Sequence, residues 1–199
     1  MARLGRRPGA VRVEVWLASA VGGIAVIGNL TTAVQILTGR FLYYFGSGDP
    51  RLPLVQLPQL LQADVRPGHT YTVADLAPGL RVLCASPSVV AAGTIAVAVV
   101  LLAGVLNRIA AGRAFDPPVR RRVALLSVVL IGGGLLQGLL DTAAIAAIAA
   151  SVDRVAIEGI GTNLPSWPWT LIVVGVVVWA LGAAFAEGAR LKEDVAGVV

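Results

Sequence analysis

Charged residues are almost absent from four long segments of this chain. Residues 15–37, 88–107, 123–150 and 167–186 contain 91 residues and a single charged side chain, that of Asp141. The other 26 of the 27 charged residues lie in the remaining 108 positions. Soluble domains carry about 25% charged residues, against 14% here. This segregation excludes a water-soluble globule, a disordered tail and a secreted disulfide scaffold, and it predicts a membrane protein with four spans.

The lengths of these segments fit membrane-spanning helices. About 20 apolar residues cross a hydrocarbon core of about 30 Å, and every backbone group there must be paired within its own segment. We therefore predict an all-α membrane protein in which residues 1–199 form a single integral membrane domain, a bundle of four transmembrane helices. The third segment is too long for the bilayer, so we expect its end, Ala143–Ala150, to continue as a helix beyond the interface. The spans are expected at about 15–37, 88–107, 123–145 and 167–186.

The first span resembles a signal peptide only in part. Four arginines precede it, and Ala18-Ser19-Ala20 has the composition of a cleavage site. However, about five apolar residues come before that site, whereas signal peptides usually have 7–15. The apolar stretch also runs on to Leu37. We expect an uncleaved anchor.

Lysine and arginine predict the orientation. Residues 1–14, 108–122 and 187–199 carry 11 of them in 42 positions, whereas 38–87 and 151–166 carry 5 in 66. Because positive charge is retained on the cytoplasmic side, both termini are expected in the cytoplasm, with extracytoplasmic segments at 38–87 and 146–166. Aromatic residues mark the expected interfaces, Trp16 at the inner one and Tyr43, Tyr44, Trp167 and Trp169 at the outer one.

The extracytoplasmic segments contain short runs typical of strands. These runs are Thr70–Val73 and Leu80–Leu83, separated by Ala77-Pro78-Gly79 as a turn signal, and Val152–Glu158. Three strands packed on a surface can be stable where an isolated hairpin is marginal. We predict that the three runs pair in a small β-containing extracytoplasmic cap over the helix ends.

Polar side chains within the spans gather near the outer interface. Asp141 lies about 28 Å from Arg122 at helical rise, and Gln137 is one turn away on the same face. Asn29 and Gln35 occupy the outer part of the first span. Such residues are costly in lipid and often functional. Two interpretations remain open, hydrogen bonding between helix ends and the cap, and an outward-facing polar cleft for a ligand or ion. Gly134 and Gly138 form a small-residue face that favours close helix packing within the bundle over dimerisation.

The inner loop combines a helix start with a basic cluster. Asp116 followed by Pro117 is typical of an N-cap and a first helical position. Arg120, Arg121 and Arg122 then lie where anionic headgroups would be and are expected to anchor the protein at the membrane surface. We expect no direct binding of nucleic acid by so small a cluster. Cys84 and His69 are the only residues of their kinds, so we expect no disulfide within the chain, no metal site and no cofactor.

The cytoplasmic segments resemble those of a known family. Leu106–Phe115 and the run Leu181–Asp194 are similar to the inner-loop and closing signatures of an uncharacterised bacterial membrane family, domain of unknown function 2975. Two positions depart from that pattern, with Ala114 in place of a proline and Val198 in place of a threonine. The resemblance implies a four-helix protein of the bacterial plasma (inner) membrane. It implies no established activity, so it transfers no catalytic or binding residue.

Three classes of function remain to be weighed. We expect no enzyme, because the spans hold one acid and no cluster of a nucleophile with a base. A small transporter or channel subunit using a cleft near Asp141 is the alternative. The favoured hypothesis is a non-catalytic regulatory protein that contacts the lipid bilayer and binds a membrane or cytoplasmic protein, or a second copy of itself. Phe115 would either anchor that partner or dip into the headgroup layer. The candidate docking residues are Gly112, Phe115, Phe185, Glu187 and Arg190.

Overall fold

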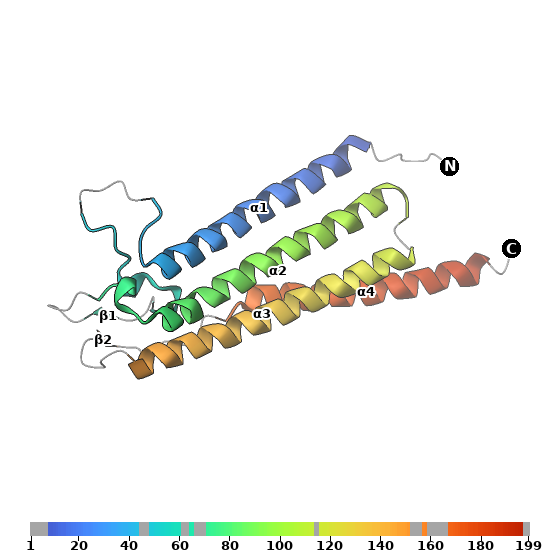
Figure 1. Cartoon of the computed structure of the whole chain (residues 1–199). Helices are drawn as coiled ribbons and strands as arrows, with labels where there is room; N and C mark the ends of the chain where they lie inside the picture. Colours follow the sequence, from blue (N-terminus) through green and yellow to red (C-terminus); the bar gives the residue numbers. More distant parts are fainter. Residues whose placement is uncertain are drawn as a thin grey trace. The chain divides into compact units, whose positions relative to one another are not determined.

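Four long helices dominate the computed structural model of the chain (Figure 1). They are α1 (Pro8–Thr38), α2 (Pro78–Ala110), α3 (Pro117–Ser151) and α4 (Trp169–Ala196). Each contains a segment long and apolar enough to cross a membrane, so the chain is a multi-pass helical membrane protein. The backbone is described for residues 8–43, 48–60, 64–65, 71–113, 116–151, 157–158 and 167–196, and side chains for 13–43, 48–60, 71–113, 116–151, 167–184 and 186–188.

The helices are longer than the predicted spans. α2 begins ten residues before the expected start at 88. The predicted continuation of helix through Ala143–Ala150 is confirmed, and α4 extends beyond the predicted span over Glu187–Asp194. Helices of 28 to 35 residues are about 42–52 Å long at 1.5 Å per residue. This length exceeds the ~30 Å hydrocarbon core, so the helices are long enough to extend into the headgroup layers.

Large apolar side chains cover much of the helix surface. Trp16 is 76% exposed on α1, Val100 71% on α2, Val128 66% on α3 and Trp179 65% on α4. Soluble monomers rarely expose contiguous apolar patches above a few hundred Å². Lipid tails solvate such side chains as well as a protein core does. The exposed residues are therefore those expected to face lipid.

The chain forms two compact units. The first contains Met1–Val26, Gly93–Gly133 and Trp169–Val199, and the second contains Ile27–Ala92 and Gly134–Pro168.

In the first unit, glycines allow the helices to approach one another closely. Gly22 of α1 faces Val99 of α2, and a Cβ at Gly133 of α3 would lie 2.9 Å from the Cβ of Thr94. A Cβ at Gly175 of α4 would lie 2.6 Å from Ile131 Cγ1 of α3. Close approach at small residues is the usual source of packing energy between membrane helices.

The second unit has an apolar core built around the α1–α2 connection, the residues between Thr38 and Pro78. The connection includes two 3-10 turns, η1 (Leu54–Gln56) and η2 (Pro58–Leu60). A leucine from each turn, with Leu57 between them, is at most 1% exposed. Burying a leucine from water contributes about 1.5–3 kcal/mol, which fixes this segment on the helix ends. The helix residues buried against it are Ala33, Ile36, Cys84, Ala85, Ala144 and Ile148.

Gly39 ends α1 and starts the connection. It has φ +67°, and Arg40 N donates to Gln35 O at 3.2 Å, the hydrogen bond of a Schellman motif. A Cβ at Gly39 would lie 2.8 Å from the Cα and N of Ala74. The backbone of η3 (Val73–Asp75) therefore packs directly on this glycine.

The predicted three-run sheet is wrong. Leu80–Leu83 lies in α2, because Pro78 suits the first helical position and Ala77 O accepts hydrogen bonds from the N–H groups of Leu80 and Arg81. Thr72 instead forms a bridge with Pro53. Ile157–Glu158 forms β2, which pairs antiparallel with β1 (Asp64–Val65), each strand being two residues long (Figure 1). Thr70 and residues 152–156 of the predicted runs lie outside the described residues.

Pro87 lies inside α2 and removes one backbone donor from the helix. Ser86 Oγ donates to Leu83 O at 2.7 Å, the carbonyl that the missing N–H would have reached. Gln59 Nε2 donates to Cys84 O at 3.1 Å. The sequence thus supplies two side-chain donors to the carbonyls around its proline.

Candidate functional site

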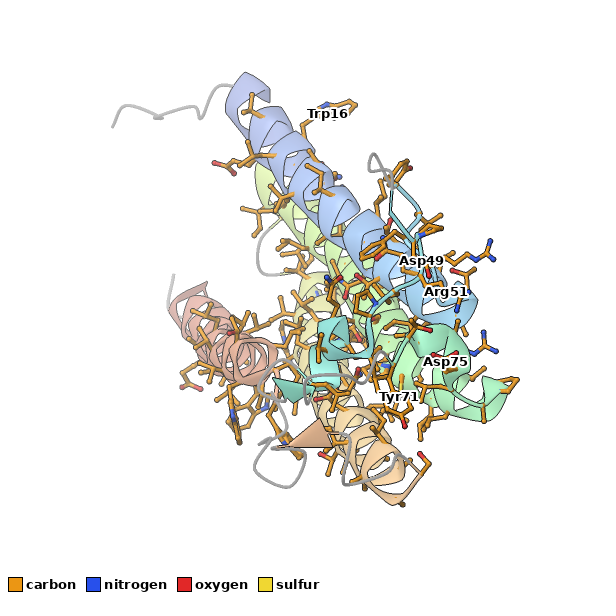
Figure 2. All side chains as sticks on the ribbon, turned by 90° about the vertical axis from the view of Figure 1, so that its left-hand side faces the viewer. Trp16, Asp49, Arg51, Tyr71 and Asp75 are labelled. Carbon is orange, nitrogen blue, oxygen red and sulfur yellow. The ribbon has the colours of Figure 1, made fainter. Side chains whose placement is uncertain are left out.

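A pocket of about 380 Å³ opens in the second unit. This volume falls within the range of about 300–1,000 Å³ typical of small-molecule sites. Residues from the end of the connection, the first turn of α2 and the last residue of α3 surround it. Figure 2 shows Tyr71 and Asp75 close to the start of α2. The lining residues are Tyr71, Thr72, Asp75, Leu76, Ala77, Leu80 and Ser151.

Thr72 and Asp75 form a capping box at η3. Thr72 N and Oγ1 both donate to Asp75 Oδ2, at 2.9 and 2.7 Å. The Thr72 hydroxyl and then its backbone N–H lower the pKa of Asp75 below its ordinary value of 3.8, because both hydrogen bonds favour the carboxylate. Asp75 is exposed and is therefore an anion at neutral pH.

An ion pair involves Arg51, whose charge also acts on this carboxylate. Arg51 Nε is 3.3 Å from Asp49 Oδ2, and both side chains are more than half exposed. Figure 2 shows the two residues next to each other. Exposed pairs contribute only about 0.2–1 kcal/mol. Arg51 also lowers the pKa of Asp75, but less than Thr72 does.

Two helix ends meet at the pocket. Ala77 comes directly before α2 and Leu80 lies in its first turn, whereas Ser151 is the last residue of α3. Ser151 Oγ donates back to Ala147 O at 2.7 Å. The start of a helix carries about +0.5 of an elementary charge and its end about −0.5. The two ends therefore nearly cancel, and the Asp75 carboxylate dominates the charge around the pocket.

None of the residues predicted to form a site lines this pocket. Thr72-x-x-Asp75 fits the capping-box pattern, and Pro78 fits a first helical position. Those two signals together would have predicted a turn that ends in a helix, in place of two strands. No pattern in the sequence pairs Ser151 with residues 71–80, since that contact depends on tertiary packing.

The residues of the predicted polar cleft are all partly or fully buried. Asp141 is 6% exposed and lies close enough to Cys84 of α2 to interact with it electrostatically. Gln137 precedes Asp141 by one turn of α3, and its Oε1 is buried without a hydrogen-bond partner among the described residues. Asn29 and Gln35 are half-buried on α1. A cleft joining these four residues stays a prediction.

Two of the predicted docking residues, Gly112 and Glu187, are among the residues with described side chains, and both belong to the first unit. Gly112 is exposed in the turn after α2, with φ +74°, and Glu187 is exposed on α4. Phe115 lies outside the described residues, as do the side chains of Phe185 and Arg190, whose backbone belongs to α4.

The three arginines predicted to anchor the membrane surface differ from one another. Arg120 and Arg121 are exposed, whereas Arg122 is half-buried. A Cβ at Gly104 of α2 would lie 3.0 Å from Arg122 Cζ. Arg122 therefore packs across the α2–α3 pair, while the other two remain accessible to headgroups.

The pocket is suited to binding. It offers one carboxylate, three hydroxyl groups and an apolar wall of Leu76, Ala77 and Leu80. Over the residues that the structure describes, no group of three or more histidine, cysteine or acidic side chains could hold a metal ion. In comparisons with known proteins, the chain matches no family model, no curated protein and no solved structure.

Proposed function

We propose that this chain is a non-catalytic regulatory membrane protein that binds a small ligand at the pocket and a protein partner at the other end of its helices. One observation carries the proposal. Leu80 of α2 and Ser151 of α3 both line the pocket, and the opposite ends of these two helices flank the loop 111–116. A ligand that contacts both helices can therefore act on the loop that joins them.

Helix length supports this coupling. α2 has 33 residues and α3 has 35, so each extends about 50 Å at 1.5 Å per residue. When a ligand binds, packed helices can move as rigid bodies by about 1–2 Å. Gly133 against Thr94, and Arg122 against Gly104, hold the two helices together. A shift at the pocket is thereby passed to the inner loop.

The distribution of arginine and the family resemblance support the proposed location of this protein in the membrane. The excess of arginine around 1–14, 108–122 and 187–199 supports cytoplasmic termini, with the pocket on the opposite side. The resemblance to the family of domain of unknown function 2975 supports a bacterial plasma membrane. It adds no activity, so the docking surface of Gly112, Phe115, Phe185, Glu187 and Arg190 rests on the cytoplasmic position of these residues.

In-cell crosslinking of the tagged protein, followed by affinity purification and mass spectrometry, tests the docking surface. We expect a stoichiometric partner that is lost from a Phe115→Ala, Arg190→Ala double variant. Trp179→Ala is the matched control, because Trp179 is exposed on the apolar part of α4. This variant should still bind the partner. Retention of every native partner by the double variant would contradict the proposal.

A transporter or channel subunit is the second candidate, and the burial of Asp141 favours it. An acid that is 6% exposed inside a span is by default a candidate for an ion pathway. This alternative predicts that Asp141→Asn abolishes an ion or solute flux in vesicles, whereas Asp75→Asn does not. Equal flux in wild type, Asp141→Asn and Asp75→Asn would exclude the transporter or channel function.

A further inference from the structure

We propose that the pocket binds a small protonated amine, with Asp75 as its counter-ion. The inference deepens the proposed function by assigning a chemical class to its ligand. The amine can come from a free solute or from the amino headgroup of a lipid, because both present the same ammonium group to the pocket.

Charge is the first argument. Of the seven lining residues, Asp75 alone carries a formally charged side chain. The helix ends contribute about +0.5 from α2 and −0.5 from α3, which leaves the carboxylate unopposed within the lining. Arg51, whose charge acts on Asp75, is paired with Asp49 at 3.3 Å. A cation is therefore favoured over an anion or a neutral molecule.

The geometry of Asp75 is the second argument. Its Oδ2 accepts hydrogen bonds from the backbone N–H and the hydroxyl of Thr72, at 2.9 and 2.7 Å, so the carboxylate is held in place before any ligand arrives. Within the described part of the chain, no hydrogen bond reaches Oδ1. This second oxygen can accept from an ammonium group, and the fixed carboxylate loses little entropy on binding.

Size and apolar lining restrict the amine further. A volume of about 380 Å³ corresponds to about a dozen waters at roughly 30 Å³ each, which is too small for a folded segment of protein. Tyr71 supplies an aromatic ring suited to a cation, and Leu76 and Leu80 supply an apolar wall. These features fit an ammonium group on a short apolar body.

Three probes with four carbons each distinguish the effect of ligand charge from that of ligand size. The full chain is placed in nanodiscs of phosphatidylglycerol, a lipid without an amine, and is titrated with n-butylamine, butyrate and butanol by calorimetry. We expect n-butylamine alone to bind saturably. Asp75→Asn should weaken n-butylamine binding about fivefold, or about 1 kcal/mol. The effect is this small because Asp75 is exposed, and solvent screens an exposed ion pair. The Asn side chain keeps an oxygen for the capping box. Glu14→Gln, which removes an exposed acid outside the pocket, should bind like wild type.

Adding phosphatidylethanolamine to the nanodiscs distinguishes the two sources. If the lipid headgroup occupies the pocket, the apparent affinity for n-butylamine falls, and the fall disappears in Asp75→Asn. If a free solute is the ligand, the affinity is unchanged, and the inference stands in either case. Preferential binding of butyrate or butanol, or equal n-butylamine affinity in wild type and Asp75→Asn, would overturn it.

The two proposals fail separately. Absent amine binding with a partner that still depends on Phe115 would overturn this inference and leave the docking proposal intact. Saturable amine binding with no partner that depends on Phe115 would do the reverse.

Discussion

Replacing Gly39 with alanine should loosen the second unit by a predictable amount. An alanine at φ +67° costs about 1–2 kcal/mol. Its Cβ would lie 2.8 Å from two backbone atoms of Ala74, about 0.6 Å closer than ordinary contacts, which begin at 3.4 Å. Overpacking of this kind costs about 1–3 kcal/mol. The expected loss is therefore at least about 2 kcal/mol.

Cys84 provides the assay for this loss. It is fully buried in the second unit and is the only cysteine of the chain, so a maleimide reports its exposure without engineered labels. Because 1.4 kcal/mol corresponds to a tenfold change in population, Gly39→Ala should raise the labelling rate in detergent micelles about 25-fold or more. This estimate holds when opening is fast relative to labelling.

Gly79→Ala is the matched control. No atom lies within 4 Å of a Cβ at Gly79, which belongs to the first turn of α2. Alanine is favoured over glycine in helices by roughly 0.5–1 kcal/mol, so this variant should label at the wild-type rate or more slowly. Equal labelling rates for Gly39→Ala and wild type would refute the argument from backbone conformation and close contact.

Two further variants and one pH titration test other features of the structure. Gly133→Ala should destabilise the α2–α3 contact by about 1–3 kcal/mol in thermal unfolding, whereas Gly132→Ala, which meets no atom within 4 Å, should not. Leu57→Ala, which truncates a fully buried side chain, should cost about 2–5 kcal/mol. The same change at Leu139, which is 58% exposed to the expected lipid, should have little effect, and equal losses at both would contradict the assigned core. Finally, the Thr72 hydrogen bonds lower the pKa of Asp75 below 3.8. They therefore stabilise the folded protein fully above pH 3.8, and this stabilisation is lost as the pH falls through the lower pKa of the folded state. Titration of n-butylamine should accordingly give one affinity from pH 7 to 5, and a steep decline within that window would show that another group controls binding.

The helices could be predicted because their signal is local. Low charge over segments of at least 20 residues identified all four, and the helical continuation of Ala143–Ala150 followed from segment length alone. The bilayer requires internal pairing of the backbone, so β-branched residues such as the valines of α4 did not mislead the assignment.

Outside the four spans, local propensity was a poor guide. Leu80–Leu83 has the composition of a strand, yet Pro78 allows helix to begin two residues earlier. The burial of Leu54, Leu57 and Leu60 in one core depends on contacts with three helices, which no window of sequence contains. The pocket was missed for the same reason, because Ser151 joins residues 71–80 only after folding.

The composition of this core also sets an order of events during synthesis. Leu54, Leu57 and Leu60 are made early, but the core they enter includes Ala144 and Ile148 of α3, which leave the ribosome more than 80 residues later. At about 5–20 residues per second, these leucines wait roughly 4–17 seconds for their final neighbours. A chain truncated before α3 would display them to water and become a substrate for chaperones and proteases. Completion of α3 is thus the step at which these leucines gain the last helix of their core.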